Sequence, residues 1–161
     1  MTLIAKLNQN LTKFKYLMAL LSAFNFLLTP IHIAISGLNP AYVIVINYTL
    51  VILGSAIIAT DKRAKMITYI LGIITLVTIW LEFSNAESNS IFICRLVLSF
   101  FLFVTFCIIL IKQLLRIKEV NLRFILGPIL GFLYFGIIGG IIFETMHFID
   151  PNAFQLIEGF S

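Results

Sequence analysis

Long apolar runs, each broken by few polar side chains, dominate the hydrophobicity pattern of the chain. A helix needs about 20 apolar residues to cross the hydrocarbon core of a bilayer. The pattern therefore predicts five transmembrane helices, which cover residues 16–36, 41–60, 65–81, 91–111 and 124–146. Because the connections are short and no internal repeat occurs, we expect one all-α integral membrane bundle.

The composition agrees with this fold class. Of the 161 residues, 61% are hydrophobic and only 11% are charged, and the mean hydropathy is +1.10. Soluble domains carry about 25% charged residues, and a domain of this size could not bury so much apolar surface. The lipid bilayer is therefore the expected surrounding of the chain.

Basic residues mark alternate ends of the predicted spans. They lie before the first span, between the second and third, and between the fourth and fifth: Lys6, Lys13, Lys15, Lys62, Arg63, Lys65, Lys112, Arg116, Lys118 and Arg123. The opposite side has no Lys or Arg in its connections and carries the acidic residues Glu82, Glu87, Glu144, Asp150 and Glu158. Since basic loops stay in the cytoplasm, we expect a cytoplasmic N-terminus, an outside C-terminus and a place in the inner (plasma) membrane. The net charge of +4 follows from this topology and does not indicate nucleic-acid binding.

Two segments flank the spans on the cytoplasmic side. Residues 1–15 have apolar positions at helical spacing, which predicts an interfacial amphipathic segment. Residues 112–123 form a basic amphipathic linker, for which an ordinary basic loop is an equal alternative. The predicted units are therefore these two segments, a four-span bundle over 16–111, and a glycine-rich fifth span with an outer turn over 124–161.

Arg95 is the only basic residue outside the cytoplasmic loops. An intramembrane charge is costly and demands a role or a partner. A voltage sensor needs several arginines at three-residue spacing, whereas apolar residues follow Arg95 at that spacing. We therefore expect this side chain to snorkel outward or to pair with Glu82, Glu87 or Glu144.

Few other polar side chains occur within the spans. Asn25 and Asn47 are expected to hydrogen-bond between helices. For His32, a hydrogen-bonded interfacial histidine is favoured over a proton relay. Cys94 and Cys107 are thirteen residues apart in one predicted helix, hence about 20 Å apart, which excludes a disulfide between them.

The fifth predicted span concentrates glycine. It holds Gly127, Gly131, Gly136, Gly139 and Gly140, and it includes two GxxxG pairs. Small residues at this spacing let a neighbouring helix approach closely. We expect a helix to pack there, either from this bundle or from a second subunit.

The sequence contains no motif of a known enzyme class, so we expect no catalytic residue, no cofactor and no enzymatic activity. Glu144, His147 and Asp150 follow one another at three-residue steps, which raises the hypothesis of a divalent-metal site. An exposed polar helix end explains the same pattern and is favoured, so no metal is expected.

An apolar and acidic turn follows the glycine-rich span. Its distinctive residues are Glu144, His147, Asp150, Pro151 and Phe154, the last three within the sequence FIDPNAF. Residues 112–156 resemble the bacterial potassium channels of the two-transmembrane superfamily that carry extra N-terminal spans, with Asn152 where glycine is commoner. The resemblance implies a turn that leads into a pore, potassium as the ion, and a homo-oligomer or a pore-forming partner subunit. A T-V-G-Y-G filter, whose carbonyls select the ion, is missing, so no residue is assigned to ion coordination.

Two functions follow as expectations. The first is a potassium-channel-like membrane protein that acts as a truncated, split or pore-less subunit. The alternative is a small membrane interaction or assembly subunit that docks a partner helix on its glycine-rich span. A small transporter or membrane enzyme would need polar residues that converge at mid-depth, and the spans offer few of them.

Overall fold

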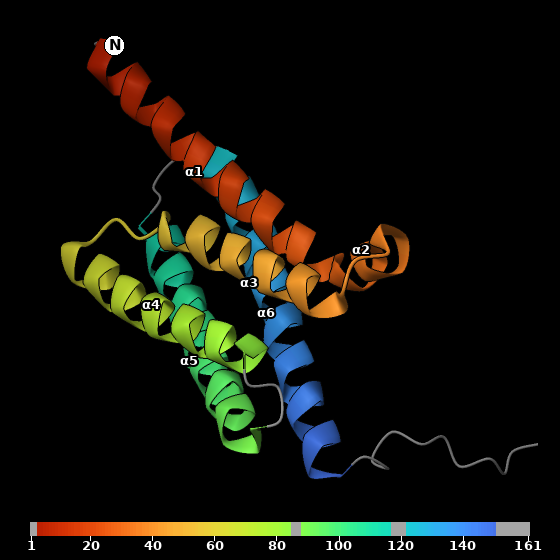
Figure 1. The fold of residues 1–161 in the computed structure, drawn as a ribbon. Coiled ribbons are helices and arrows are strands. Elements are labelled where there is room, and N and C mark those ends of the chain that lie inside the picture. Colours follow the sequence, from red (N-terminus) through yellow and green to blue (C-terminus); the bar gives the residue numbers. More distant parts are fainter. Residues whose placement is uncertain (1–2, 85–87, 117–121, 151–161) are drawn as a thin grey trace, which may run out of the picture.

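The computed structural model describes residues 3–84, 88–116 and 122–150, without the side chains of residues 3–13 and 123. The described residues form a bundle of helices (Figure 1). In chain order these are α1 (Leu3–Leu27), α2 (Thr29–Ser36), α3 (Pro40–Ala56), α4 (Lys62–Ser84), α5 (Asn89–Leu114) and α6 (Leu122–Ile149). No strand occurs in these three ranges. The predicted all-α fold class is confirmed.

Three helices, α4, α5 and α6, are each long and apolar enough to cross a membrane. A fourth crossing is present if the bent pair of α1 and α2 counts as one span. Helix α3 is apolar but has 17 residues, a length of about 26 Å, and falls short of the usual span. The structure thus gives three to four helices able to cross, which supports a membrane protein.

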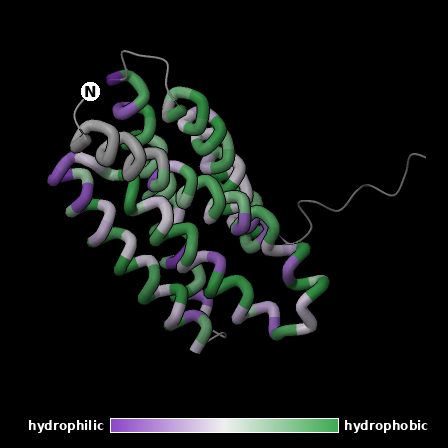
Figure 2. The backbone as a smooth tube through the Cα atoms, turned by 90° about the horizontal axis from the view of Figure 1, so that it is seen from above, coloured by the Kyte–Doolittle hydropathy of each residue, from purple (hydrophilic) through white to green (hydrophobic). Residues whose placement is uncertain are grey.

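The surface of the bundle is apolar. In the most hydrophobic 18-residue stretches of α4, α5 and α6, only 22%, 44% and 28% of the residues are buried inside the molecule. Figure 2 shows that hydrophobic residues predominate along the helices. Such exposure is unfavourable in water and suits contact with lipid chains.

A bend of 60° separates α1 from α2, where the sequence predicts one span over residues 16–36. Pro30 lacks the N–H that would bond to the carbonyl of Phe26. The Thr29 hydroxyl donates to that carbonyl instead, at 2.5 Å. Helix α2 then ends at Gly37, whose φ of +61° is the left-handed conformation that glycine adopts readily. At its other end α1 continues unbroken to Leu3, so most of the predicted interfacial segment 1–15 is part of the same helix.

The core lies where α5 packs between α4 and α6, and where α1 packs against α3 and α6. Phe103, Phe106 and Tyr134 form an aromatic cluster with ring centroids 5.8 to 6.0 Å apart. On the other side, Gly54 of α3 faces Ser22 of α1 so closely that a Cβ atom would collide with the serine side chain. The close approach of α1 and α3 therefore requires glycine at this position.

The two ends of the bundle differ in charge. One end, the basic end, carries Lys62 and Arg63 at the start of α4 and Lys112 and Arg116 at the end of α5. The opposite end, the acidic end, is where α4 and α6 finish and α5 begins. The predicted linker 112–123 starts inside α5 and ends inside α6, and residues 117–121 lie outside the described residues.

Candidate binding site at the acidic end

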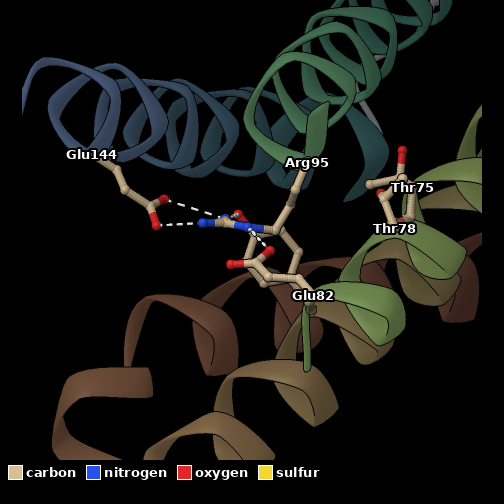
Figure 3. Close-up of polar contacts among 6 residues, drawn as sticks. Thr75, Thr78, Glu82, Arg95 and Glu144 are labelled. Atoms are coloured by element: carbon tan, nitrogen blue, oxygen red, sulfur yellow. Dashed lines mark hydrogen bonds and ion pairs between the residues drawn. The ribbon is translucent and has the colours of Figure 1, made fainter. Parts of the chain in front are cut away.

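Arg95 lies between two carboxylates that come from neighbouring helices, as Figure 3 shows. It is near the start of α5, whereas Glu82 is near the end of α4 and Glu144 is in the last two turns of α6. Its Nη2 lies 2.5 Å from Glu144 Oε1 and its Nη1 3.3 Å from Oε2, so this pair is bidentate. Its Nε lies 2.5 Å from Glu82 Oε2, in an ion pair without hydrogen-bond alignment. The predicted pairing is confirmed for these two residues, while Glu87 lies outside the described residues.

Two aromatic rings complete the surroundings of the guanidinium. The centroid of Phe92 lies 4.9 Å from Arg95 Cζ, and that of Tyr48 lies 5.9 Å away. Both distances are within the range of a cation–π contact. The Tyr48 hydroxyl also accepts a long hydrogen bond of 3.5 Å from Arg95 Nη1. Arg95 thus links groups from α3, α4 and α6 to α5.

The helix dipoles give these charges no help. Glu82 lies in the last turn of α4, where the dipole favours a positive charge. Arg95 and Glu144 lie beyond the terminal turns of α5 and α6, where the dipole effect has fallen off. Only 6% of Arg95 is exposed. Mutual attraction within this set of three residues, the Arg95 cluster, is therefore what stabilises them here.

A partly open cavity of about 480 Å³ adjoins the Arg95 cluster. Every helix contributes to its walls, which are mainly apolar: Phe26, Leu27, Pro30, Ile44, Val45, Ile79, Phe83, Ile137 and Ile141. Gly136 and Gly140 of α6 also line the wall. A Cβ atom added at either glycine would have no neighbouring side chain within 4 Å, so the backbone of α6 is open to the cavity here. The volume and the few convergent polar groups are typical of a small-molecule site.

A chain of amide and hydroxyl side chains supports the cavity wall. Asn25 Nδ2 donates to Asn47 Oδ1 at 2.8 Å, and Asn47 Nδ2 donates to the hydroxyl of Thr29 at 3.0 Å. Nδ1 of His32 lies 3.4 Å from the same amide nitrogen. These contacts join α1, α2 and α3, and they confirm that both asparagines hydrogen-bond between helices.

The glycines of α6 divide into two groups. Gly127 and Gly131 face α5, where a Cβ on the first would collide with Leu114. A Cβ on the second would lie 3.4 Å from Leu110. The first GxxxG pair is therefore packed within this bundle. Gly136, Gly139 and Gly140 have no heavy atom within 4 Å of a Cβ position, so the second pair has no such neighbour in the described part of the chain.

The predicted outer turn is only partly described. His147 and Asp150 are exposed, whereas Glu144 belongs to the Arg95 cluster. In the described ranges no three His, Cys, Asp or Glu side chains are grouped as metal ligands. Pro151 and Phe154 lie outside the described residues.

Tyr48 and Phe92 belong to the site although sequence reasoning missed them. The signals were weak but present. A tyrosine in the middle of an apolar run needs a partner for its hydroxyl. Phe92 precedes Arg95 by three residues, which places both on one helix face.

A comparison of the chain with known protein families, curated proteins and solved structures finds no match. The resemblance to potassium channels therefore stays a prediction.

Proposed function

We propose that this protein is a five-span protein of the inner (plasma) membrane with a cytoplasmic N-terminus and an outside C-terminus. In this arrangement the bent pair of α1 and α2 makes one crossing, and the shorter α3 makes another. The separation of charge between the basic and acidic ends supports the orientation. Large apolar side chains on α3 that remain more than half exposed, Tyr42, Ile46 and Leu53, support contact with lipid.

Within the membrane, the protein binds a small amphipathic molecule with a positively charged head in the cavity beside the Arg95 cluster. The observation that carries this proposal is the composition of the cluster. Two carboxylates surround one guanidinium, so the formal charge is −1 when all three groups are ionised. The Glu144 side chain remains 42% exposed, so one carboxylate can accept a ligand.

The apolar walls suit the rest of such a ligand. Phe26, Phe83 and Phe92 place aromatic rings in the cavity lining, and aromatic faces attract organic cations. A hydrogen bond or ion pair to a charged group contributes about 1.5–3 kcal/mol. We therefore expect a cation to bind about 10 to 100 times more tightly than a neutral molecule of the same shape.

Titration of the protein in lipid nanodiscs tests this proposal. The probe is benzyltrimethylammonium, and its neutral isostere is neopentylbenzene. The chain has a single tryptophan, Trp80, whose ring centroid lies 6.2 Å from that of the cavity residue Phe83. Its fluorescence should change saturably with the cation, and half-saturation should need at least tenfold more of the neutral isostere.

Variants identify the site. Gly140→Leu should abolish the cation response because its side chain would project into the empty part of the cavity. Glu144→Gln should weaken it about tenfold. The matched control is Asp61→Asn, which removes a carboxylate from the basic end and should leave the response unchanged. Equal responses to cation and isostere, or full binding by Gly140→Leu, would contradict the proposal.

A second candidate is the predicted subunit function. In it, the open surface of α6 at Gly136, Gly139 and Gly140 packs against a helix from another copy or from a pore-forming partner. The observation in its favour is the space beside Gly139, which does not line the cavity. Gly139→Ile should therefore break an oligomer without affecting cation binding, and an unchanged assembly would count against this candidate.

If the protein is a subunit of a potassium-channel-like assembly, the chain alone in liposomes should give no selective potassium flux, because selectivity needs a filter of carbonyl oxygens.

A further inference from the structure

A second cavity, of about 560 Å³, lies at the basic end between the start of α4 and the end of α5. Four cationic side chains and one carboxylate line it: Lys62, Arg63, Lys112, Arg116 and Asp61. The formal charge of this lining is therefore +3. Of these four cations, only Arg116 has an acidic partner among the described residues, since its Nη1 lies 3.3 Å from Asp61 Oδ2. The other three cations remain available for an anion.

The start of α4 adds to the attraction for an anion. The first backbone bond there is donated by the Lys65 N–H to the carbonyl of Asp61, at 2.9 Å. The N–H groups of residues 62–64 precede that bond and have no acceptor within the helix. A helix N-terminus with such groups favours phosphate, and here it coincides with the basic lining.

The wall of this cavity beyond the charged residues is apolar. Ile67 of α4 and Ile108 of α5 are 52% and 47% exposed, and Ile109 lies beside them. The hydroxyl of Thr105, which also lines the cavity, already donates to the carbonyl of Phe101 at 2.8 Å. The cavity thus joins a cationic rim to a hydrocarbon surface.

Hydrogen bonds anchor the end of α5 at this cavity. Gln113, near the end of α5, donates to the carbonyl of Ile58 at 3.0 Å and accepts from the Tyr16 hydroxyl at 2.7 Å. The end of α5 is thereby joined to α1 and to the connection between α3 and α4. These bonds hold the end of α5 against the backbone that leads into α4, so the two helix ends that carry the cationic groups lie next to each other.

We propose that this cavity binds the phosphate headgroup of an anionic phospholipid, with an acyl chain along the apolar wall of α4 and α5. The pairing of a cationic rim with a hydrocarbon wall favours a lipid over a free anion or an acidic peptide, neither of which would use the wall. Basic pockets between membrane helices bind anionic headgroups in this manner. The site is at the opposite end from the Arg95 cluster and takes a ligand of opposite charge, so it does not depend on the function proposed above.

Native mass spectrometry of the purified full chain tests the proposal. The protein is equilibrated with equal amounts of phosphatidylglycerol and phosphatidylcholine, with and without 10 mM inorganic phosphate. We expect one retained phosphatidylglycerol per chain, preferred at least tenfold over phosphatidylcholine and not displaced by phosphate. Equal retention of the two lipids, or displacement of the lipid by phosphate, would overturn the proposal.

Matched variants separate the site from general attraction between a basic surface and anionic lipid. The double variant Lys62→Gln/Arg63→Gln removes two charges that line the cavity. Its retention of phosphatidylglycerol should fall about 25-fold, at about fivefold for each charge. The double variant Lys15→Gln/Lys65→Gln removes two charges that do not line it and should change retention less than threefold. Equal losses in both would overturn the proposal.

A variant of the apolar wall gives an independent check that does not alter charge. Ile108→Trp places a bulky ring at a position that is already exposed, so folding should be preserved and is verified by circular dichroism. Lipid retention should fall at least tenfold because the ring occupies the path of the acyl chain. Unchanged retention would mean that no chain lies on this wall, which would also overturn the proposal.

Discussion

Replacement of Arg95 by glutamine removes the one cation of the Arg95 cluster and leaves Glu82 and Glu144 facing each other. Loss of one partner from a buried ion pair costs about 3–5 kcal/mol. The lower part of that range applies, because the two glutamate side chains are 24% and 42% exposed and can be partly hydrated. The lost cation–π contacts with Phe92 and Tyr48 add about 0.5–1 kcal/mol. We expect the free energy of unfolding to fall by about 3–4 kcal/mol.

The assay is equilibrium unfolding in mixed micelles of increasing SDS content, followed by circular dichroism. The informative comparison is the neutral triple variant Glu82→Gln/Arg95→Gln/Glu144→Gln, which removes every charge of the cluster together. Because it leaves no unpaired charge, it should be more stable than the single Arg95→Gln variant. If the single variant unfolds within about 1 kcal/mol of the natural chain, or if the triple variant is no more stable than the single one, the reasoning about this ion pair is wrong.

Three further predictions concern the helices and their orientation. Gly54→Val should destabilise the fold by about 1–3 kcal/mol in the same titration, because the new side chain collides with Ser22; an unchanged midpoint would mean that α1 and α3 are not in close contact. Asn47→Leu should cost about 1–2 kcal/mol, since it leaves the hydrogen-bonding groups on α1 and α2 without their partner; a gain in stability would contradict this role. In a cysteine-free background, Asp150→Cys should react with an impermeant maleimide applied to intact cells and Asp61→Cys only after lysis; the reverse pattern would invert the proposed topology.

Much of the fold follows from the period and length of the apolar runs. Hydrophobic runs predict helices wherever the backbone must satisfy its own hydrogen bonds in lipid, and α4, α5 and α6 occupy the predicted places. The break at Leu28 does not follow from Pro30 alone, because membrane helices often accommodate a proline without breaking. At the bend, the Thr29 hydroxyl donates to the carbonyl of Phe26 that Pro30 leaves free, a contact that the sequence alone does not indicate.

Of the candidate site, too, only a part could be predicted from the sequence. The pairing of Arg95 could be predicted because an unpaired charge at this depth is too costly, so an acid had to lie nearby. The cavity could not be predicted, because its walls come from every helix and depend on how the helices cross. A GxxxG pair indicates a surface open to close approach but not what approaches it. Gly127 faces α5 of its own chain, while Gly140, thirteen residues later, faces the cavity.

Photolabelling offers the most direct test of a cation site beside the Arg95 cluster. A benzylammonium probe that carries a diazirine would be irradiated with the protein in nanodiscs, and the labelled residues mapped by peptide sequencing. The account predicts label concentrated on the cavity-lining stretches around Phe92 and residues 136–144, and its loss when benzyltrimethylammonium is added in excess. Label spread over outward-facing positions such as Ile73 and Phe132, unaffected by the competitor, would contradict it.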